Sequence, residues 1–343
     1  MYRVGIIGCG EIGQHHAKAY AAMPDVQLVA VSDVVAEAAT ALAKQYEGVT
    51  AYQGHQEMLE KEALDVVSVC TWPQVRAMLV SDVCRHGGVR LIYAEKPMAM
   101  NLKEADAMVE AARQAGILLV VGHQRRYGAR WRQAKEMLHE GAIGQLIRIE
   151  AACEGWDAFQ WGTHWVDIMR FFNDDQPVDW VLAQVDRRWD RIRFGHRMET
   201  ECIAQIGFHN GVRAVLETGD HIVGAGFYNR LIGTDGMIEV DAAKKIPLRA
   251  FTRTGYIVPE LRDAEPNFPS EVGRAISSAL RTVEAGSLEH PLNGASARAT
   301  TEVVMAIYES ARIGRLVELP LQQNDSPLGL MLGRVGVPLV VAP

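Results

Sequence analysis

Apolar and polar positions alternate between two patterns along the first 122 residues. Short apolar runs, which are typical of buried parallel strands, alternate with segments whose apolar residues recur at helical spacing. The runs predict strands at 4–7, 26–32, 49–52, 64–70, 89–94 and 117–122, and the intervening segments predict helices at 14–22, 35–46, 56–61, 74–86 and 102–115. Asn101 is the expected N-cap of the last helix, and Gly116 its stop. This alternation predicts a doubly wound parallel sheet over residues 1–122.

The pattern changes in the second part of the chain, residues 123–343, which we assign to a second α/β domain. It is mainly strand-like up to about residue 250, with predicted strands at 146–153, 178–189, 201–208, 212–218, 229–233 and 237–240. Helical spacing returns at 131–140, 164–172, 269–285 and 296–313, and Ser296 is the expected N-cap of the last helix. Residues 322–343 carry several prolines and glycines and receive no assignment.

Composition narrows the possible functions. The 343 residues are 48% hydrophobic and carry a formal charge of −7, without a basic run, so nucleic acid is not an expected partner. The five cysteines form no CxxC pair, and no His or Cys cluster has metal-ligand spacing, which predicts reduced thiols, a cytoplasmic protein and no metal site. A strand begins within a few residues of Met1, leaving no room for a signal peptide, and no apolar run approaches the ~20 residues of a membrane span.

The first predicted strand leads directly into Gly8-x-Gly10-x-x-Gly13 and a helix. This fingerprint allows a tight turn, close approach of a pyrophosphate and close packing of helix on sheet, which makes it the mark of a Rossmann dinucleotide site. Asp33 ends the second strand, about 20 residues past the last glycine, where a ribose-binding carboxylate is expected. Because a carboxylate repels a 2′-phosphate, Asp33 favours NAD over NADP. Its alternative role is that of a turn or capping acid.

Two further loops follow predicted strands of the same sheet, Thr71-Trp72-Pro73 and Glu95-Lys96-Pro97. Parallel sheets bind ligands at the carboxyl ends of their strands, so these loops are expected beside the cofactor. The predicted cofactor contacts are therefore Gly8, Gly10, Glu11, Ile12, Gly13, Asp33, Thr71, Trp72, Pro73, Glu95, Lys96 and Pro97.

With these motifs the chain resembles the glucose–fructose oxidoreductase, inositol dehydrogenase and MocA-like oxidoreductases. The resemblance includes His16 after the glycines, Glu95-Lys96-Pro97, and the segments 141–144, 162–167 and 306–312. It implies a Rossmann domain followed by an α/β domain with a large, open, mostly antiparallel sheet that serves as a homo-oligomer interface. It also implies nicotinamide-dependent oxidation of a secondary hydroxyl on a sugar, inositol-like polyol or sugar acid.

The resemblance also implies roles for particular residues. Lys96 would contact nicotinamide ribose and substrate hydroxyl, and His164 would be the general acid or base. Both fit hydride chemistry, which needs a proton acceptor and a positive charge near the developing alkoxide. Their alternatives are a surface lysine and a core histidine. The other predicted substrate contacts are Arg126, Tyr127, Gln160 and Trp161, with Arg125 also plausible and with interdomain packing as the alternative.

Two positions depart from the pattern of these relatives. Many carry an aspartate four residues before the histidine, where this chain has Gln160, which cannot ionise. Asp167 is the expected assistant of His164, and Asp157 a weaker substitute. Arg76 stands where histidine is frequent, and we expect at most an ion pair on the helix surface. His16 is expected to face the cofactor crevice or the neighbouring loop.

The sequence thus predicts an NAD-dependent oxidoreductase acting on a CH–OH group, with two rivals. In the first, tightly held NAD oxidises a glycoside transiently and assists its cleavage or epimerisation. In the second, the protein is a sensor that binds dinucleotide and sugar without catalysis. The substrate itself cannot be named, because pocket residues from separate loops are not ordered in space by the sequence.

Overall fold

The computed structural model of the protein describes residues 1–224, 226–241, 246–262, 268 and 270–332. The chain divides into two compact units. The first comprises Met1–Gln124 with the described part of Glu265–Arg298, and the second comprises the described parts of Arg125–Ala264 and Ala299–Val337. This division differs from the expected continuous second domain of residues 123–343. The returning segment carries helix α8 (Glu271–Glu284), which packs against a helix and a strand of the first unit.

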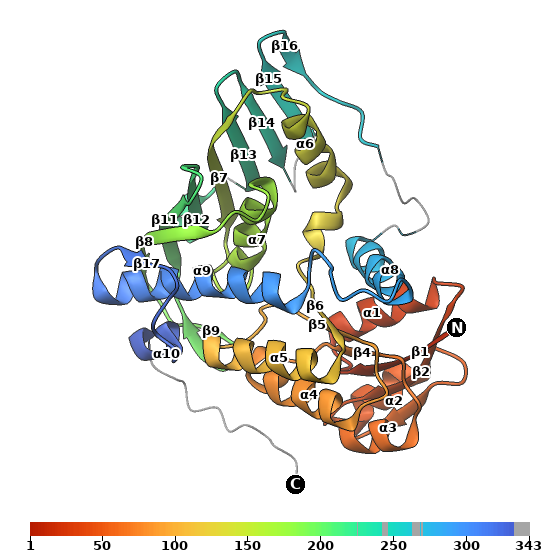
Figure 1. Ribbon diagram of the computed structural model, residues 1–343. Coiled ribbons are helices and arrows are strands. Elements are labelled where there is room, and N and C mark those ends of the chain that lie inside the picture. The colour runs from red at the N-terminus through yellow and green to blue at the C-terminus, as the bar shows by residue number, and fades with distance from the viewer. Residues whose placement is uncertain (225, 242–245, 263–267, 269, 333–343) are drawn as a thin grey trace. The chain divides into compact units, whose positions relative to one another are not determined.

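The first unit is built on a six-stranded parallel sheet (Figure 1). Its strands are β1 (Tyr2–Ile7), β2 (Val26–Ser32), β3 (Thr50–Tyr52), β4 (Val66–Val69), β5 (Leu91–Ala94) and β6 (Leu118–Val121), in the spatial order β3-β2-β1-β4-β5-β6. Its helices are α1 (Glu11–Ala21), α2 (Ala36–Ala43), α3 (His55–Lys61), α4 (Pro73–His86) and α5 (Leu102–Ala115). This order is that of a doubly wound Rossmann sheet, so the predicted fold class is confirmed for this part.

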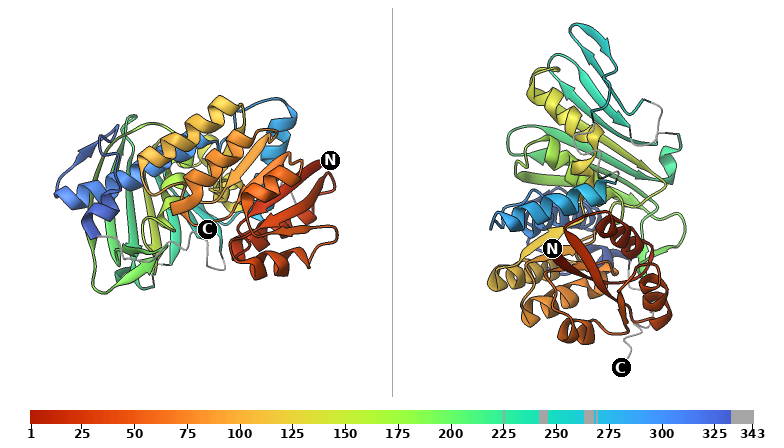
Figure 2. Two further views of the ribbon diagram at one scale, coloured as in Figure 1. Left: turned by 90° about the horizontal axis from the view of Figure 1, so that it is seen from below. Right: turned by 90° about the vertical axis from the view of Figure 1, so that its right-hand side faces the viewer.

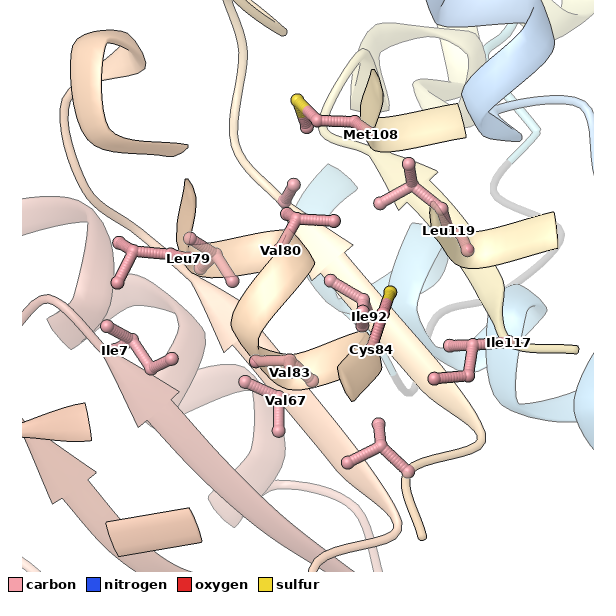
Figure 3. Close-up of a cluster of buried hydrophobic side chains, with 14 of the residues drawn as sticks. Ile7, Val67, Leu79, Val80, Val83, Cys84, Ile92, Met108, Ile117 and Leu119 are labelled. Carbon is pink, nitrogen blue, oxygen red and sulfur yellow. The ribbon is translucent and has the colours of Figure 1, made fainter. Parts of the chain in front are cut away.

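Apolar side chains from strands and helices fill the space on one side of this sheet (Figure 3). Leu79, Val80 and Val83 of α4 pack toward Val67 of β4 and Ile92 of β5, and all five are buried. The strands are mostly apolar because both faces of a parallel sheet are covered. This rigid core fixes the carboxyl ends of β1, β4 and β5, where the predicted cofactor loops begin.

Three predicted helix ends test the local predictions. Asn101 caps α5 as expected, because its side-chain oxygen accepts a hydrogen bond from the Glu104 amide at 2.9 Å. Gly116 ends the helix in the left-handed conformation, with φ of 66°. The prediction for Ser296 was wrong, because α9 begins at Gly294, so that Ser296 lies inside the helix and donates its amide to Asn293 at 2.9 Å.

The second unit is built on a nine-stranded sheet in the order β16-β15-β14-β13-β7-β12-β11-β8-β17. All neighbours are antiparallel except β7 and β12, so the predicted large, mostly antiparallel sheet is confirmed. The strands are β7 (Leu146–Glu154), β8 (Val178–Asp186), β11 (Glu201–Phe208), β12 (Arg213–Gly219), β13 (Phe227–Gly233), β14 (Met237–Asp241), β15 (Leu248–Thr252), β16 (Gly255–Ile257) and β17 (Val317–Glu318). A separate hairpin joins β9 (Arg191–Arg193) to β10 (His196–Met198).

Helices α6 (Ala129–His139) and α7 (Gly162–Phe172) pack on one face of this sheet (Figure 2). Short 3-10 turns lie at Gln124–Tyr127 and Asp220–Ile222. The boundary between the two units falls inside α9 (Gly294–Ile313), after Arg298, and α10 (Pro327–Leu332) lies in the segment that received no assignment. The rest of that segment, from residue 333 onward, is outside the described residues. Within the described part of the chain, no helix combines the length and apolar character that a membrane span requires.

Candidate active site

The glycine turn of the first unit has the geometry of a dinucleotide site. A side chain at Gly13 would place its Cβ 2.0 Å from the backbone oxygen of Gly8, and one at Gly8, whose φ is 98°, would lie 2.8 Å from that of Cys70. A Cβ at Gly10 would meet nothing within 4 Å, so the backbone there faces open space. No side chain caps the N-terminus of α1 at Gly10. These features fit a pyrophosphate approaching the backbone and the helix N-terminus.

The Asp33 side chain is hydrogen-bonded to this turn. One of its carboxylate oxygens accepts a hydrogen bond from the Cys9 amide at 2.7 Å and the other accepts one from the Val35 amide at 2.9 Å. The residue therefore fulfils the alternative role of a turn acid, while the N-cap of α2 is Val35 and has no side-chain cap. Because each carboxylate oxygen can accept two hydrogen bonds and the residue is half-buried, it keeps acceptor capacity for ribose hydroxyls.

The other predicted cofactor residues of this unit lie at the same edge of the sheet. Thr71 contacts the glycine turn, since its methyl carbon would be 3.1 Å from a Cβ at Gly8. Trp72 is 59% exposed and Ile12 is 40% exposed, so both offer surface to a ligand. Lys96 is half-buried in the loop that leaves β5. The first unit thus gathers its whole predicted cofactor set around the carboxyl ends of β1, β2, β4 and β5.

His16 faces the neighbouring loop that follows β5, which is one of its two expected positions. Its imidazole is fully buried, with Nδ1 3.0 Å from the Ser68 hydroxyl and Nε2 3.0 Å from a carboxylate oxygen of Glu95. Burial alone lowers the pKa of His16, but Cys70 and the Glu95 carboxylate outweigh it and raise the pKa to about 10. Burial raises the pKa of Glu95, while the hydrogen bond from His16 and the nearby positive charges bring it below its ordinary value. The pair is therefore an ion pair beneath the Lys96 loop.

Arg76 was predicted to lie on the helix surface, and this prediction was wrong. It is 1% exposed, and its guanidinium donates hydrogen bonds to the backbone oxygens of Pro97 and Thr71. Sequence position alone could not reveal this, because the two acceptors are carbonyl groups rather than side chains.

In the second unit, His164 lies in the first turn of α7 and is 3% exposed. The ring of Trp161 meets it edge-on at 6.0 Å between centroids, and Trp161 also contacts Trp156 at 5.2 Å and Phe227 at 5.4 Å. The guanidinium carbon of Arg125 is 5.1 Å from the centre of the Trp161 ring. His164 therefore stands next to an aromatic and cationic cluster, which suits the face and hydroxyls of a sugar ring.

Asp167, the expected assistant of His164, is paired with Arg126, which was predicted to contact the substrate. Arg126 holds Asp167 through a two-point ion pair, with both nitrogen–oxygen distances at 2.7–2.8 Å, and also binds Asp175 at 2.7 Å. Arg126 and Asp167 are 3% and 1% exposed, and Thr300 donates a further hydrogen bond to Asp167 at 3.1 Å. Tyr127 is buried as well. This geometry favours a structural role for the Arg126–Asp167 pair.

Gln160 precedes α7 and lies in the turn that leads into it, so it is not part of the helix face that the sequence suggested. Its backbone N–H donates a hydrogen bond to the Asp157 carboxylate at 2.5 Å. The neighbouring Ala158 amide donates to Glu199 at 2.6 Å, and the Tyr308 hydroxyl donates to the other oxygen of Glu199 at 2.9 Å. Glu199 and Tyr308 were not predicted as site residues, although Tyr308 belongs to the recognised segment 306–312. Together they anchor the loop that precedes His164.

Glu199 makes the stability of the second unit pH-dependent. Burial, and then the Asp157 carboxylate, raise its pKa to about 7. The folded state therefore binds a proton that the unfolded state has lost, and stability falls as the pH rises from about 4.5 through 7. Since one pKa unit corresponds to about 1.4 kcal/mol, the shift from 4.5 to about 7 predicts that Glu199→Gln stabilises the protein by roughly 3 kcal/mol above pH 7 and removes most of this slope.

Urea unfolding at pH 5, 7 and 8.5 measures this effect. Glu136→Gln, which changes an exposed carboxylate on α6, is the matched control and should leave the slope as in the wild type. An unchanged slope in Glu199→Gln would show that Glu199 is ionised in the folded protein at neutral pH.

The chain is similar to known proteins in sequence and structure. Residues 2–123 match a family described as an oxidoreductase family with an NAD-binding Rossmann fold. Myo-inositol 2-dehydrogenase of Thermotoga maritima is 30% identical over 43% of this chain and 44% of its own length, so the match spans less than half of that relative. Inositol 2-dehydrogenase 3 of Saccharopolyspora erythraea is 26% identical over 95% of this chain and 98% of its own.

A solved structure covers almost the entire chain. It is an oxidoreductase from Agrobacterium radiobacter in complex with NAD⁺, L-tartaric acid and magnesium, with a TM-score of 0.79 over 96% of this chain and 99% of its own at 20% identity. At that identity the likeness concerns the fold, and it extends beyond the first unit to the large mixed sheet. No group of three or more His, Cys, Asp or Glu side chains suited to a metal occurs among the residues that the structure describes.

Proposed function

We propose that the chain is an NAD-dependent dehydrogenase of a secondary hydroxyl, a member of the glucose–fructose oxidoreductase, inositol dehydrogenase and MocA-like oxidoreductases, whose NAD-binding Rossmann family matches residues 2–123. The substrate class is a sugar, an inositol-like polyol or a sugar acid. The observation that carries the proposal is the arrangement at one edge of the parallel sheet, which combines open space at Gly10, an uncapped helix N-terminus, Asp33 and Lys96.

The first unit would hold the cofactor. Gly8, Gly10 and Gly13 with the first residues of α1 would receive the pyrophosphate, and Asp33 would bind the adenosine ribose and disfavour NADP. Thr71, Trp72 and Pro73, together with the Glu95–Pro97 loop, would line the nicotinamide. When bound, the nicotinamide accepts a hydride from the substrate carbon or returns it.

Residues of the chain would stabilise the negative charge on the substrate oxygen and transfer the hydroxyl proton. Lys96 would donate a hydrogen bond to the substrate oxygen and stabilise its negative charge as the carbon–hydrogen bond weakens. His164 would take the hydroxyl proton in oxidation and return it in reduction. Gln160 and Trp161, at the start of α7, would bind the ring and its other hydroxyls. We assign Asp167 and Arg126 to the support of α7, since each already satisfies the charge of the other.

A homo-oligomer formed through the open face of the nine-stranded sheet is also part of the proposal. It is supported by Leu182 of β8 and Ile203 of β11, which are each 43% exposed on these strands.

The direct test combines purified protein, NAD or NADP, and a panel of polyols, aldoses, sugar acids and glycosides, with NADH absorbance as the measurement. We expect net reduction of NAD with at least one polyol or sugar, and a preference for NAD over NADP of at least about tenfold. A different outcome would be that protein carrying bound NAD cleaves or epimerises glycosides without net formation of NADH. That outcome would contradict net oxidation and support the redox-neutral reaction. Calorimetric binding of NAD and sugars without any turnover would show a sensor.

A further inference from the structure

Two loops of the first unit are joined by one buried guanidinium. The loop Thr71–Pro73 follows β4 and the loop Glu95–Pro97 follows β5, and these strands are parallel neighbours in the sheet. Arg76 in the first turn of α4 donates one terminal N–H to the backbone oxygen of Thr71 and another to that of Pro97. The side chain thus connects the two loops at the edge of the sheet where the cofactor is proposed to bind.

Arginine suits this task for a physical reason. Its planar guanidinium presents several N–H groups in a rigid fork, so one side chain can bind two carbonyl groups in a fixed relation. A lysine ammonium is a single point on a flexible stem, and an imidazole has one nitrogen on each side of a small ring. Burial lowers the pKa of Arg76 to about 10, against the opposing effect of Glu95, so the group remains charged at neutral pH.

The Glu95–Pro97 loop is also held at its first residue, Glu95. Glu95 accepts hydrogen bonds from His16 at 3.0 Å and from the Lys96 amide at 3.2 Å. Gly122 leaves room for this carboxylate, because a Cβ at that position would lie 2.6 Å from it. Lys96 therefore lies between Glu95, which His16 holds, and Pro97, which Arg76 holds.

We propose that Arg76 is a positioning residue, which locks the Thr71–Pro73 loop to the Glu95–Pro97 loop and thereby fixes Lys96 relative to the nicotinamide contacts. The link between the loops is a property of the first unit alone, whereas its catalytic consequence rests on the proposed function. Misplacement of a catalytic group by about 1 Å can cost on the order of a hundredfold in rate, so a link of this kind has a measurable effect.

Arg76→Met is the main test, and Arg85→Met on the same helix is its matched control, because the side chain of Arg85 is 74% exposed. Amide hydrogen exchange is followed in peptides that cover residues 70–74 and 94–101, and NAD affinity is measured by calorimetry. We expect Arg76→Met to raise exchange at least about tenfold in both peptides and to lower kcat by roughly ten- to a hundredfold, with a smaller change in the KM for substrate. Arg85→Met should match the wild type in all of these.

Arg76→Lys separates charge from geometry and replaces the methionine variant if that one fails to fold. It keeps the positive charge but can reach one loop at a time, so we expect faster exchange in at least one of the two peptides and a reduced kcat. A folded variant with wild-type exchange in both peptides would overturn the proposal, and so would full activity of Arg76→Met. If the wild type turns over no substrate, the proposed function fails, while the exchange and calorimetry data still decide whether the link exists.

Discussion

Replacing Lys96 by methionine is expected to lower kcat by at least about a hundredfold, with a much smaller change in the dissociation constant of NAD. Methionine keeps the length of the side chain but removes its charge and its three N–H donors. The substrate oxygen would then develop negative charge without a cation beside it, and such stabilisation typically contributes two or more orders of magnitude in rate. Steady-state kinetics with the best substrate of the panel, together with calorimetry of NAD binding, measures both quantities.

Lys103→Met provides the control, because Lys103 is an exposed lysine on α5 of the same unit. It should leave kcat and NAD affinity unchanged. A Lys96→Met variant with weaker NAD binding but an unaltered kcat would restrict Lys96 to holding the cofactor, and the proton and charge chemistry would have to be assigned to other residues.

The sequence predicted well those features that depend on neighbours along the chain. The glycine turn is specified within ten residues, and its two steric demands, at Gly8 and Gly13, are both found. Asn101 caps the helix that it precedes by one residue, and the apolar spacing after residue 164 locates α7 within two residues of its start. In each case the physical cause, such as a cap, a clash or an amphipathic face, acts over one or two turns of backbone.

Features that depend on distant partners were missed. His16 pairs with a carboxylate 79 residues away, and Arg76 binds a carbonyl 21 residues away, so neither burial could be read from the helices that carry them. Glu199 received no role from the sequence, but it holds the loop before His164 by accepting a hydrogen bond from the Ala158 backbone N–H. The return of α8 to the first unit was missed for the same reason, because it depends on a distant partner. The spacing of apolar residues in an amphipathic helix predicts which face is buried, but it does not predict which element packs against that face.

The second large effect is expected on the free energy of unfolding, when the buried ion pair between Arg126 and Asp167 in the second unit is broken. Asp167→Asn should destabilise the protein by about 3 kcal/mol or more, because it leaves the buried guanidinium of Arg126 opposite a neutral amide. Asp175, the remaining acid of this cluster, has a side chain that is 40% exposed and compensates only in part. Chemical unfolding followed by circular dichroism measures the loss, and hydrogen exchange in peptides covering α7 locates it.

Asp174→Asn is the matched control, because Asp174 is also an ion-paired aspartate, to Lys135 at 2.8 Å, but its side chain is 58% exposed. Exposed ion pairs contribute little, so its loss should be below about 1 kcal/mol. The comparison also decides the role that the sequence suggested for Asp167. If Asp167→Asn is as stable as the wild type but loses turnover and shifts the pH profile of kcat, then Asp167 assists His164 in proton transfer. If stability and α7 protection fall together, the carboxylate supports the helix that carries His164, and its effect on catalysis is indirect.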